Sequence, residues 1–324
     1  KPILNIRCWI YVFVFYFGSN GINSFAQDSC HLRVSILTCG VGNDLYSCYG
    51  HSAIRIIDSC EQTDVVYNYG TFNFSDPDFY WKFTRGKLLY YLNDESFEGF
   101  MRTYIAEGRS VVEQELQLSA LHKQKIDSFL RNNLQEEHKY YRYDFLFDNC
   151  STRIRDLFPS LFGDRFELGN AMTDDSCSFR DLLDFYERER HWERFGINLL
   201  LSDIVDRKMT NKESMFLPDY LMKGLATATI DAKPIITFTN VLLPAKAGME
   251  KQFNQPKLIL WVLLLGVFFL STSKTMSAYL IYLDILLFLL LGLLGCFMLF
   301  MWFGTEHLVC AYNRHLLWAF PLHI

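Results

Sequence analysis

The first half of the chain contains short segments whose apolar and polar residues follow the pattern of half-buried β-strands. Residues 32–38 and 111–118 alternate, and residues 52–57 and 65–69 are further short strand-like segments. Residues 58–63 lie between the second and third segments and have the composition of a hairpin turn. We therefore expect antiparallel strands, with residues 52–57 paired to residues 65–69.

Other segments have apolar residues at helical spacing. We expect helices in residues 120–134 after an N-cap at Ser119, in residues 151–158, over most of residues 178–224, and near Pro77 at the start of the aromatic segment 76–90. Residues 230–257 are predicted as an irregular or stranded linker. This mixture of strands and helices predicts an α+β domain.

The N-terminus has the features of a secretory signal peptide. Lys1 and Arg7 supply positive charge, and residues 8–17 form an apolar run too short to cross a bilayer. Ser24-Phe25-Ala26 resembles a cleavage site, so residues 1–26 are predicted to be the signal peptide. An uncleaved anchor is the alternative, and either interpretation exports the domain that follows.

Two apolar segments near the C-terminus are predicted membrane spans, about residues 258–273 and 282–303. The short loop between them contains Lys274 and no acidic residue, which suits the cytoplasmic side. We therefore expect a catalytic domain over residues 27–256 outside, and a membrane region over residues 257–324 whose loop lies inside. Beyond residue 303 we expect an interfacial or further membrane segment.

Composition excludes several classes of function. The net charge of −5, without a run of Lys or Arg, argues against nucleic-acid binding. The sequence has no Gly-rich phosphate loop and no Gly-x-Ser-x-Gly motif, so we expect neither a nucleotide cofactor nor serine hydrolase chemistry. Cys48 and His51 have metal-ligand spacing, but no second closely spaced pair accompanies them, and we predict no metal site.

Six of the nine cysteines fall in the expected exported part: Cys30, Cys39, Cys48, Cys60, Cys150 and Cys177. If Cys150 stays a thiol, the other five cannot all be paired. Three of them, Cys39, Cys48 and Cys60, lie on or next to predicted strands and are candidates for buried thiols. The spacing does not define a disulfide pattern.

Cys150 is the strongest candidate nucleophile. It follows Asp148 and Asn149, which both favour the N-cap position, at the start of an amphipathic helix. The partial positive charge of a helix N-terminus favours a thiolate, and the free N–H groups of the first turn can stabilise an oxyanion. The alternative is a structural cysteine.

His51 is the candidate base, because an imidazole can take the thiol proton and return it to a leaving group. If residues 58–63 form the turn, His51 lies near Gly70 on the paired strand, and Asn68 is its diagonal neighbour on the same face. Asn68 is then the candidate that orients the imidazole, and Asp148 is the alternative.

We take Cys150, His51, Asn68 and Asn149 as candidate catalytic residues. The candidate substrate-binding residues are Arg109, Arg153 and His307. Arg153 adds positive charge close to Cys150, and His307 follows the second predicted span on the same side as Cys150. A solvated turn with an interfacial Trp anchor is the alternative for the segment around His307.

Several motifs resemble those of Lnb, the family of lipoprotein N-acyltransferases from Bacteroides-type bacteria, over nearly all of residues 30–324. The motifs are Gly50-His51-Ser52-Ala53, Asn68-Tyr69-Gly70, Gly108-Arg109-Ser110, Tyr143-Asp144-Phe145-Leu146-Phe147-Asp148-Asn149-Cys150-Ser151-Thr152, Phe195-Gly196-Ile197-Asn198, Met215-Phe216-Leu217-Pro218, and Asn313, Leu316-Leu317-Trp318 and Pro321. The Asp-Asn-Cys-Ser-Thr segment is the most specific.

This resemblance implies an enzyme of the inner membrane with its catalytic domain in the periplasm. It implies transfer of an acyl chain from a membrane phospholipid, through a thioester on Cys150, to the N-terminal amine of a diacylglyceryl-Cys lipoprotein. The order His before Cys also resembles permuted papain-like enzymes, the group of lecithin:retinol acyltransferase. That analogy implies a small antiparallel sheet carrying His51, with the Cys150 helix packed on it.

Two other functions fit the same residues. A papain-like cell-wall peptidase or amidase would use the same Cys–His pair, although a soluble enzyme of that kind needs no membrane spans. A non-catalytic envelope protein would use Cys150 only as a structural residue.

Overall fold

The computed structural model describes residues 31–172, 176–245, 251–272 and 274–323. The predicted signal peptide, residues 1–26, and Cys30 lie outside these residues.

An antiparallel sheet of seven strands forms the centre of the domain, in the order β10-β5-β1-β2-β3-β4-β6. The strands are β1 (Leu32–Cys39), β2 (His51–Asp58), β3 (Thr63–Thr71), β4 (Leu89–Ser96), β5 (Val111–Leu116), β6 (Tyr140–Arg142) and β10 (Ile236–Leu243). The predicted α+β class and the antiparallel sheet are confirmed.

The hairpin of β2 and β3 has the predicted register. Asp58 pairs with Thr63 and Ile54 with Tyr67, so the same register places His51 opposite Gly70. A bulge interrupts the pairing of β3 with β4 between Asn68 and Thr71.

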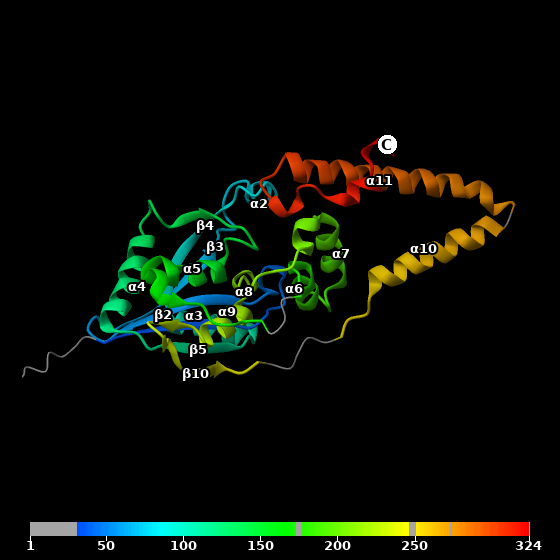
Figure 1. The fold of residues 1–324 in the computed structure, drawn as a ribbon. Helices are drawn as coiled ribbons and strands as arrows, with labels where there is room; N and C mark the ends of the chain where they lie inside the picture. The colour runs from blue at the N-terminus through cyan, green and yellow to red at the C-terminus, as the bar shows by residue number, and fades with distance from the viewer. Residues whose placement is uncertain (1–30, 173–175, 246–250, 273, 324) are drawn as a thin grey trace, which may run out of the picture.

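Helices cover both faces of the sheet (Figure 1). The helices of the domain are α2 (Phe79–Thr84), α3 (Phe97–Glu107), α4 (Ala120–Asn133), α5 (Cys150–Phe162), α6 (Phe179–Tyr186), α7 (His191–Leu200), α8 (Asn211–Ser214) and α9 (Pro218–Ala226). A second sheet contains β7 (Phe166–Glu167), β8 (Thr229–Ile230) and β9 (Lys233–Pro234).

Alternation along the strands divides the core between the two faces. Ile36 and Ile54 pack with α4, α5 and α9, whereas Leu37 and Ala53 pack with Phe100 of α3. This two-sided burial explains why β1 and β2 have adjacent apolar residues at their centres, Ile36-Leu37 and Ala53-Ile54. It also fixes the register that brings β2 under the start of α5.

Parts of this fold differ from the sequence-based prediction. The strand β4 and the helix α3 were not predicted after the aromatic segment 76–90. Within residues 230–257, predicted as an irregular or stranded linker, residues 236–243 form β10, an edge strand of the central sheet hydrogen-bonded to β5. Most of β10 is exposed, so its sequence lacks the buried alternation that marks the central strands.

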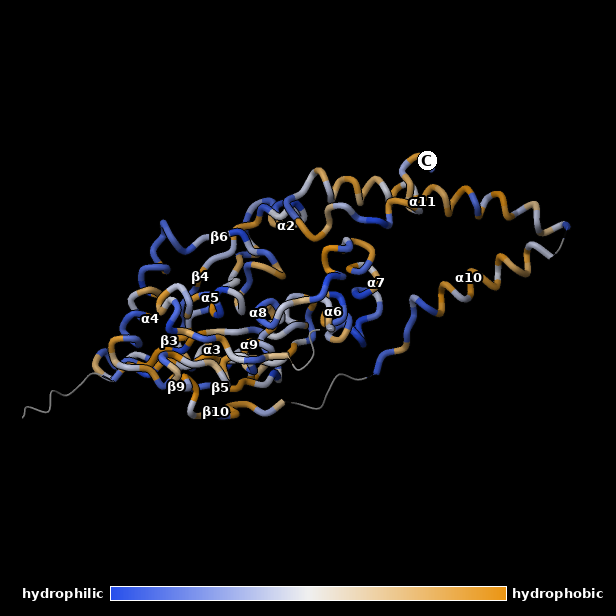
Figure 2. Tube along the Cα trace, viewed as in Figure 1, coloured by the Kyte–Doolittle hydropathy of each residue, from blue (hydrophilic) through white to orange (hydrophobic). Residues whose placement is uncertain are grey.

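Two long apolar helices, α10 (Gln255–Thr272) and α11 (Leu280–Phe303), form a hairpin that extends from the domain (Figures 1 and 2). Both are long and apolar enough to cross a membrane. The two ends of the hairpin contact the domain: Trp192 of α7 donates to Gln255, and Arg85 donates to the Gly304 carbonyl. The loop lies at the far end (Figure 1).

Residues after α11 fold back along it through 3-10 helices at Leu308–Cys310, Arg314–Leu317 and Pro321–His323. The Ala319 backbone lies against Gly295, where a Cβ atom would be 2.0 Å from the Ala319 oxygen. The ring of His323 is 5.1 Å from that of Phe288. This segment therefore follows α11 back toward the middle of the apolar helix.

Candidate active site

Cys150 is the first residue of α5, and its side chain is buried. The helix starts there because Asn149 is the N-cap: its side chain accepts from the Thr152 N–H, and the Thr152 hydroxyl accepts from the Asn149 N–H. The predicted helix start is thus observed. The cap takes the Thr152 N–H, so the first-turn N–H groups without an intrahelical acceptor are those of Cys150 and Ser151, next to the thiol.

Two glycines allow close approaches between the segments around the site. Gly50 has φ +84°, and a Cβ atom there would be 2.6 Å from the Cys39 carbonyl oxygen. Gly70 has φ +88°, and a Cβ atom there would be 3.2 Å from the Tyr143 ring and 3.9 Å from Cβ of Cys150. A side chain at either position would push these segments apart.

The predicted Cys, His and Asn side chains lie together. His51 at the start of β2 and the Cys150 thiol are close enough for each to shift the pKa of the other. Nε2 of His51 lies 3.1 Å from Oδ1 of Asn68, and Nδ2 of Asn68 donates to Oε1 of Glu95 at 3.1 Å. Glu95 on β4 was not predicted, because the strand that carries it was missed.

The electrostatics of these side chains favour a Cys150 thiolate beside a protonated His51. Burial alone would raise the pKa of the Cys150 thiol, but the charge and hydrogen bond of His51 outweigh it and lower that pKa. Burial would likewise lower the pKa of His51, but the thiolate and Asn68 raise it. Cys39 and Cys48 are also buried, and burial raises the pKa of each to about 12. Their contrast with Cys150 distinguishes an activated thiol from structural ones.

Two serines complete the environment of the thiol. The backbone N–H of Ser52 and the hydroxyl of Ser151 both help to lower the pKa of Cys150. The two serine hydroxyls are 3.0 Å apart and buried. The thiolate therefore has polar partners from both β2 and α5.

Asn149 is committed to the structure of the helix start. Its Nδ2 donates to the carbonyls of Phe145 and Phe216, at 2.7 and 2.9 Å, and its Oδ1 caps α5. Asp148, the alternative partner for His51, forms a two-pronged ion pair with Arg153, at 2.6 and 2.8 Å. Asn68 is thus the residue that the structure places on the imidazole.

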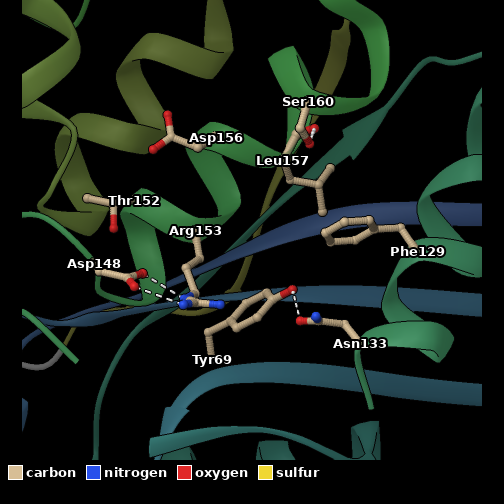
Figure 3. A pocket seen from close by; sticks show the side chains of 9 residues that line it. All are labelled: Tyr69, Phe129, Asn133, Asp148, Thr152, Arg153, Asp156, Leu157 and Ser160. Carbon is tan, nitrogen blue, oxygen red and sulfur yellow. Dashed lines mark hydrogen bonds and ion pairs between the residues drawn. The ribbon is translucent and has the colours of Figure 1, made fainter. Parts of the chain in front are cut away.

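Arg153 lines a cavity of about 210 Å³ next to α5 (Figure 3). Its guanidinium stacks 3.4 Å from the centre of the Tyr141 ring, while Asp148 neutralises its charge. The cavity is also lined by Tyr69, Phe129, Asn133, Asp148, Thr152, Asp156, Leu157 and Ser160. Cys150 is not among the residues that line this cavity.

The other two candidate binding residues lie on different sides of the site. Arg109 is buried; its Nε donates to the Gly40 carbonyl and its Nη1 to Glu107, and among the described residues its Nη2 has no partner. His307 lies at the end of the hairpin, where its Nε2 is 3.1 Å from the Phe83 carbonyl.

The structure also shows the state of three other cysteines and whether side chains gather as metal ligands. Cys39 and Cys48 are buried free thiols, as expected, but Cys60 is exposed and disulfide-bonded. Within the described part of the chain, no three His, Cys, Asp or Glu side chains form a group that would hold a metal ion.

Comparison with protein families gives two matches. Residues 25–180 match the model of the Lnb N-terminal periplasmic domain, and residues 248–324 match that of the Lnb transmembrane domain. No curated protein and no solved structure matches the chain. The first match includes Cys150, His51, Asn68 and Glu95, and the second includes both long apolar helices. The chain therefore belongs to the Lnb family and is a membrane protein with a periplasmic domain.

Proposed function

We propose that this protein is a thiol acyltransferase. It moves a fatty acyl chain from a membrane phospholipid to the N-terminal amine of a diacylglyceryl-Cys lipoprotein. The observation that carries the proposal is the buried Cys150 thiol at the N-terminus of α5, whose pKa the neighbouring His51 lowers. Membership of the Lnb family is consistent with a role in lipoprotein maturation.

In the first step, the Cys150 thiolate attacks the carbonyl carbon of a phospholipid ester. The ester C–O bond breaks, and His51 gives its proton to the departing alkoxide, which leaves as a lysophospholipid. Cys150 then carries the acyl chain as a thioester. The N–H groups at the start of α5 are placed to stabilise the oxyanion of the tetrahedral intermediate.

In the second step, the α-amine of the lipoprotein attacks the thioester carbonyl. Neutral His51 takes a proton from the attacking nitrogen, the C–S bond breaks, and an amide forms. The thiolate and the imidazolium are restored together. Asn68 acts by holding the imidazole, and Glu95 acts by holding the amide of Asn68.

Transfer requires that water does not take the place of the amine. The rings of Tyr143 and Tyr90 stack 4.5 Å apart next to the thiol and supply an apolar wall. Tethering to the membrane concentrates the enzyme with two lipid-bound substrates. We place the protein in the inner membrane with its catalytic domain in the periplasm.

Among the three candidate binding residues, we keep Arg109 as the one that contacts the phospholipid phosphate. Its Nη2 is a buried donor without a partner among the described residues, and its charge acts on His51. Arg153 and His307 already have protein partners, so we assign them to positioning of α5 and of the hairpin end.

The test uses the full chain with a phospholipid whose acyl chains carry an isotope label. The acceptor is a diacylglyceryl-Cys peptide with a free N-terminal amine, and the control acceptor has an acetylated amine. We expect label on the free amine only, and none with Cys150→Ala. Hydrolysis of cell-wall peptides without acyl transfer would instead support the peptidase or amidase function.

A further inference from the structure

The helix α2 and the loop before it expose four aromatic side chains. Phe74 is 62%, Tyr80 78%, Trp81 55% and Phe83 51% exposed, and we call these four residues the α2 aromatic face. A concentration of large exposed aromatics on one short element marks an interaction surface.

The α2 aromatic face adjoins the end of the second long apolar helix. Trp81 stacks on Phe300 of α11 with ring centres 6.0 Å apart. Arg85 donates to the Gly304 carbonyl at 3.2 Å, and its own carbonyl accepts from the Glu306 N–H at 3.0 Å. Figure 1 shows α2 beside this end of α11. Because α11 ends at Phe303, the face lies at the level where the chain leaves the membrane.

The basic side chains around this face already have protein partners. Lys82 is paired with Asp76, and Arg142 and Lys87 are both paired with Glu306. The exposed groups are instead Tyr, Trp and Phe, the side chains that concentrate at membrane–water boundaries. A lipid surface therefore fits this face better than an acidic protein partner.

A row of aromatic rings connects this face to the nucleophile. Phe79, which is buried behind the face, lies 5.8 Å from Phe72, and Phe72 lies 5.3 Å from Tyr90. Tyr90 stacks on Tyr143 at 4.5 Å, and Tyr143 adjoins Cys150 at Gly70. The row runs from α2 to the thiol and offers an apolar wall.

We propose that the α2 aromatic face inserts into the lipid surface of the leaflet in which α11 ends. The row of Phe72, Tyr90 and Tyr143 is then the wall along which the donor acyl chain reaches Cys150. The role of the row rests on the proposed acyltransferase function, whereas insertion of the face does not.

The first test measures insertion without activity. The full chain carries the photoreactive residue benzoylphenylalanine in place of Tyr80 and is reconstituted into phosphatidylethanolamine–phosphatidylglycerol vesicles. The matched control carries it in place of Phe238, which is 59% exposed on β10 at the opposite edge of the sheet. After illumination, we expect a phospholipid adduct at position 80 and none at position 238. Equal labelling at both positions, or none at position 80, overturns the insertion.

The second test measures delivery of the acyl chain. In a Tyr80→Ser/Phe83→Ser variant, we expect acylation of Cys150 by phospholipid vesicles to slow at least tenfold. Alkylation of Cys150 by iodoacetamide, which needs no membrane, should keep its wild-type rate. Phe238→Ser should change neither rate. An unchanged acylation rate, or an equal loss of acylation and alkylation, overturns the proposed delivery. If the wild type forms no thioester, the function fails, but the crosslink still decides whether the face inserts.

Discussion

The two ring nitrogens of His51 have different partners. Nε2 lies 3.1 Å from the side-chain oxygen of Asn68, which only accepts hydrogen bonds, so Nε2 carries a hydrogen. Nδ1 is then the nitrogen that can take the thiol proton. Because Nδ2 of Asn68 donates a hydrogen bond to Glu95, the amide cannot flip without losing that hydrogen bond. The tautomer of the proposed base is thus set by residues of β3 and β4.

Replacing Asn68 with Ala should lower kcat for acyl transfer on the order of a hundredfold and change KM little. The imidazole keeps its place on β2 but loses the partner that fixes its orientation. Steady-state kinetics on labelled phospholipid would measure this. Asn240→Ala on the exposed strand β10 is the control, and equal kinetics for both variants would contradict the role of Asn68.

The lowered pKa of Cys150 predicts the pH dependence of its alkylation. Iodoacetamide reacts with the thiolate, so a lowered pKa keeps the reaction fast at pH values where an ordinary thiol is protonated. In His51→Ala the lowering charge is gone while burial remains, so the midpoint of the rate profile should move to higher pH by more than one unit. The same midpoint in both proteins would show that His51 does not activate the thiol.

At the scale of elements, the turn between β2 and β3 was the feature from which the sequence predicted how His51 and Asn68 lie. Counting back from residues 58–63 places His51 near Gly70 and gives Asn68 as its neighbour, and both follow from local pairing. Glu95 escaped prediction because β4 begins inside an aromatic segment without clear alternation. The contacts of α2 with α11 join residues more than 200 positions apart, and no local pattern encodes them.

The start of α5 depends on Asn149 more than an ordinary helix start depends on its cap. Asn149→Ala removes a cap worth about 1 kcal/mol. It also leaves the buried Phe216 carbonyl and the half-buried Phe145 carbonyl without this donor, at about 1–3 kcal/mol. We expect Tm in detergent to fall by about 5–10 °C.

The control is Ser119→Ala, which removes the exposed cap of α4 and should lower Tm by only about 2–4 °C. Equal losses for the two caps would mean that Asn149 does not organise the site. Restoring part of the stability with Asn149→Asp would confirm that the capping oxygen contributes, since Asp also caps helices but cannot donate to the carbonyls.

At the scale of the whole molecule, the apolar hairpin is fixed to the domain at both of its ends. Its start contacts α7 through Gln255, and its end contacts α2 through Gly304 and Glu306. The domain therefore has a defined orientation toward the membrane rather than a flexible tether. The aromatic row extends from α2 to Tyr143, which lies next to Gly70 on the strand paired with that of His51.

Arg85→Ala should loosen the end of α11 without unfolding the domain. It removes the side-chain hydrogen bond to the Gly304 carbonyl, so amide exchange in residues 304–307 should become about 2–10 times faster. Hydrogen exchange with mass spectrometry of the full chain in nanodiscs measures this. Arg102→Ala, an exposed position on α3, should leave residues 304–307 unchanged. Equal exchange in both variants would mean that the contact does not hold the hairpin.

The most direct test of the account is the intact mass of the full chain after incubation with phospholipid vesicles and no acceptor. The account predicts a gain of one acyl chain that hydroxylamine removes, because a thioester on Cys150 is cleaved by it. Cys150→Ala should show no gain, and His51→Ala should gain the chain far more slowly. No adduct on the wild type while phospholipid is bound, or the same adduct on Cys150→Ala, would contradict the thioester and with it the proposed acyl transfer.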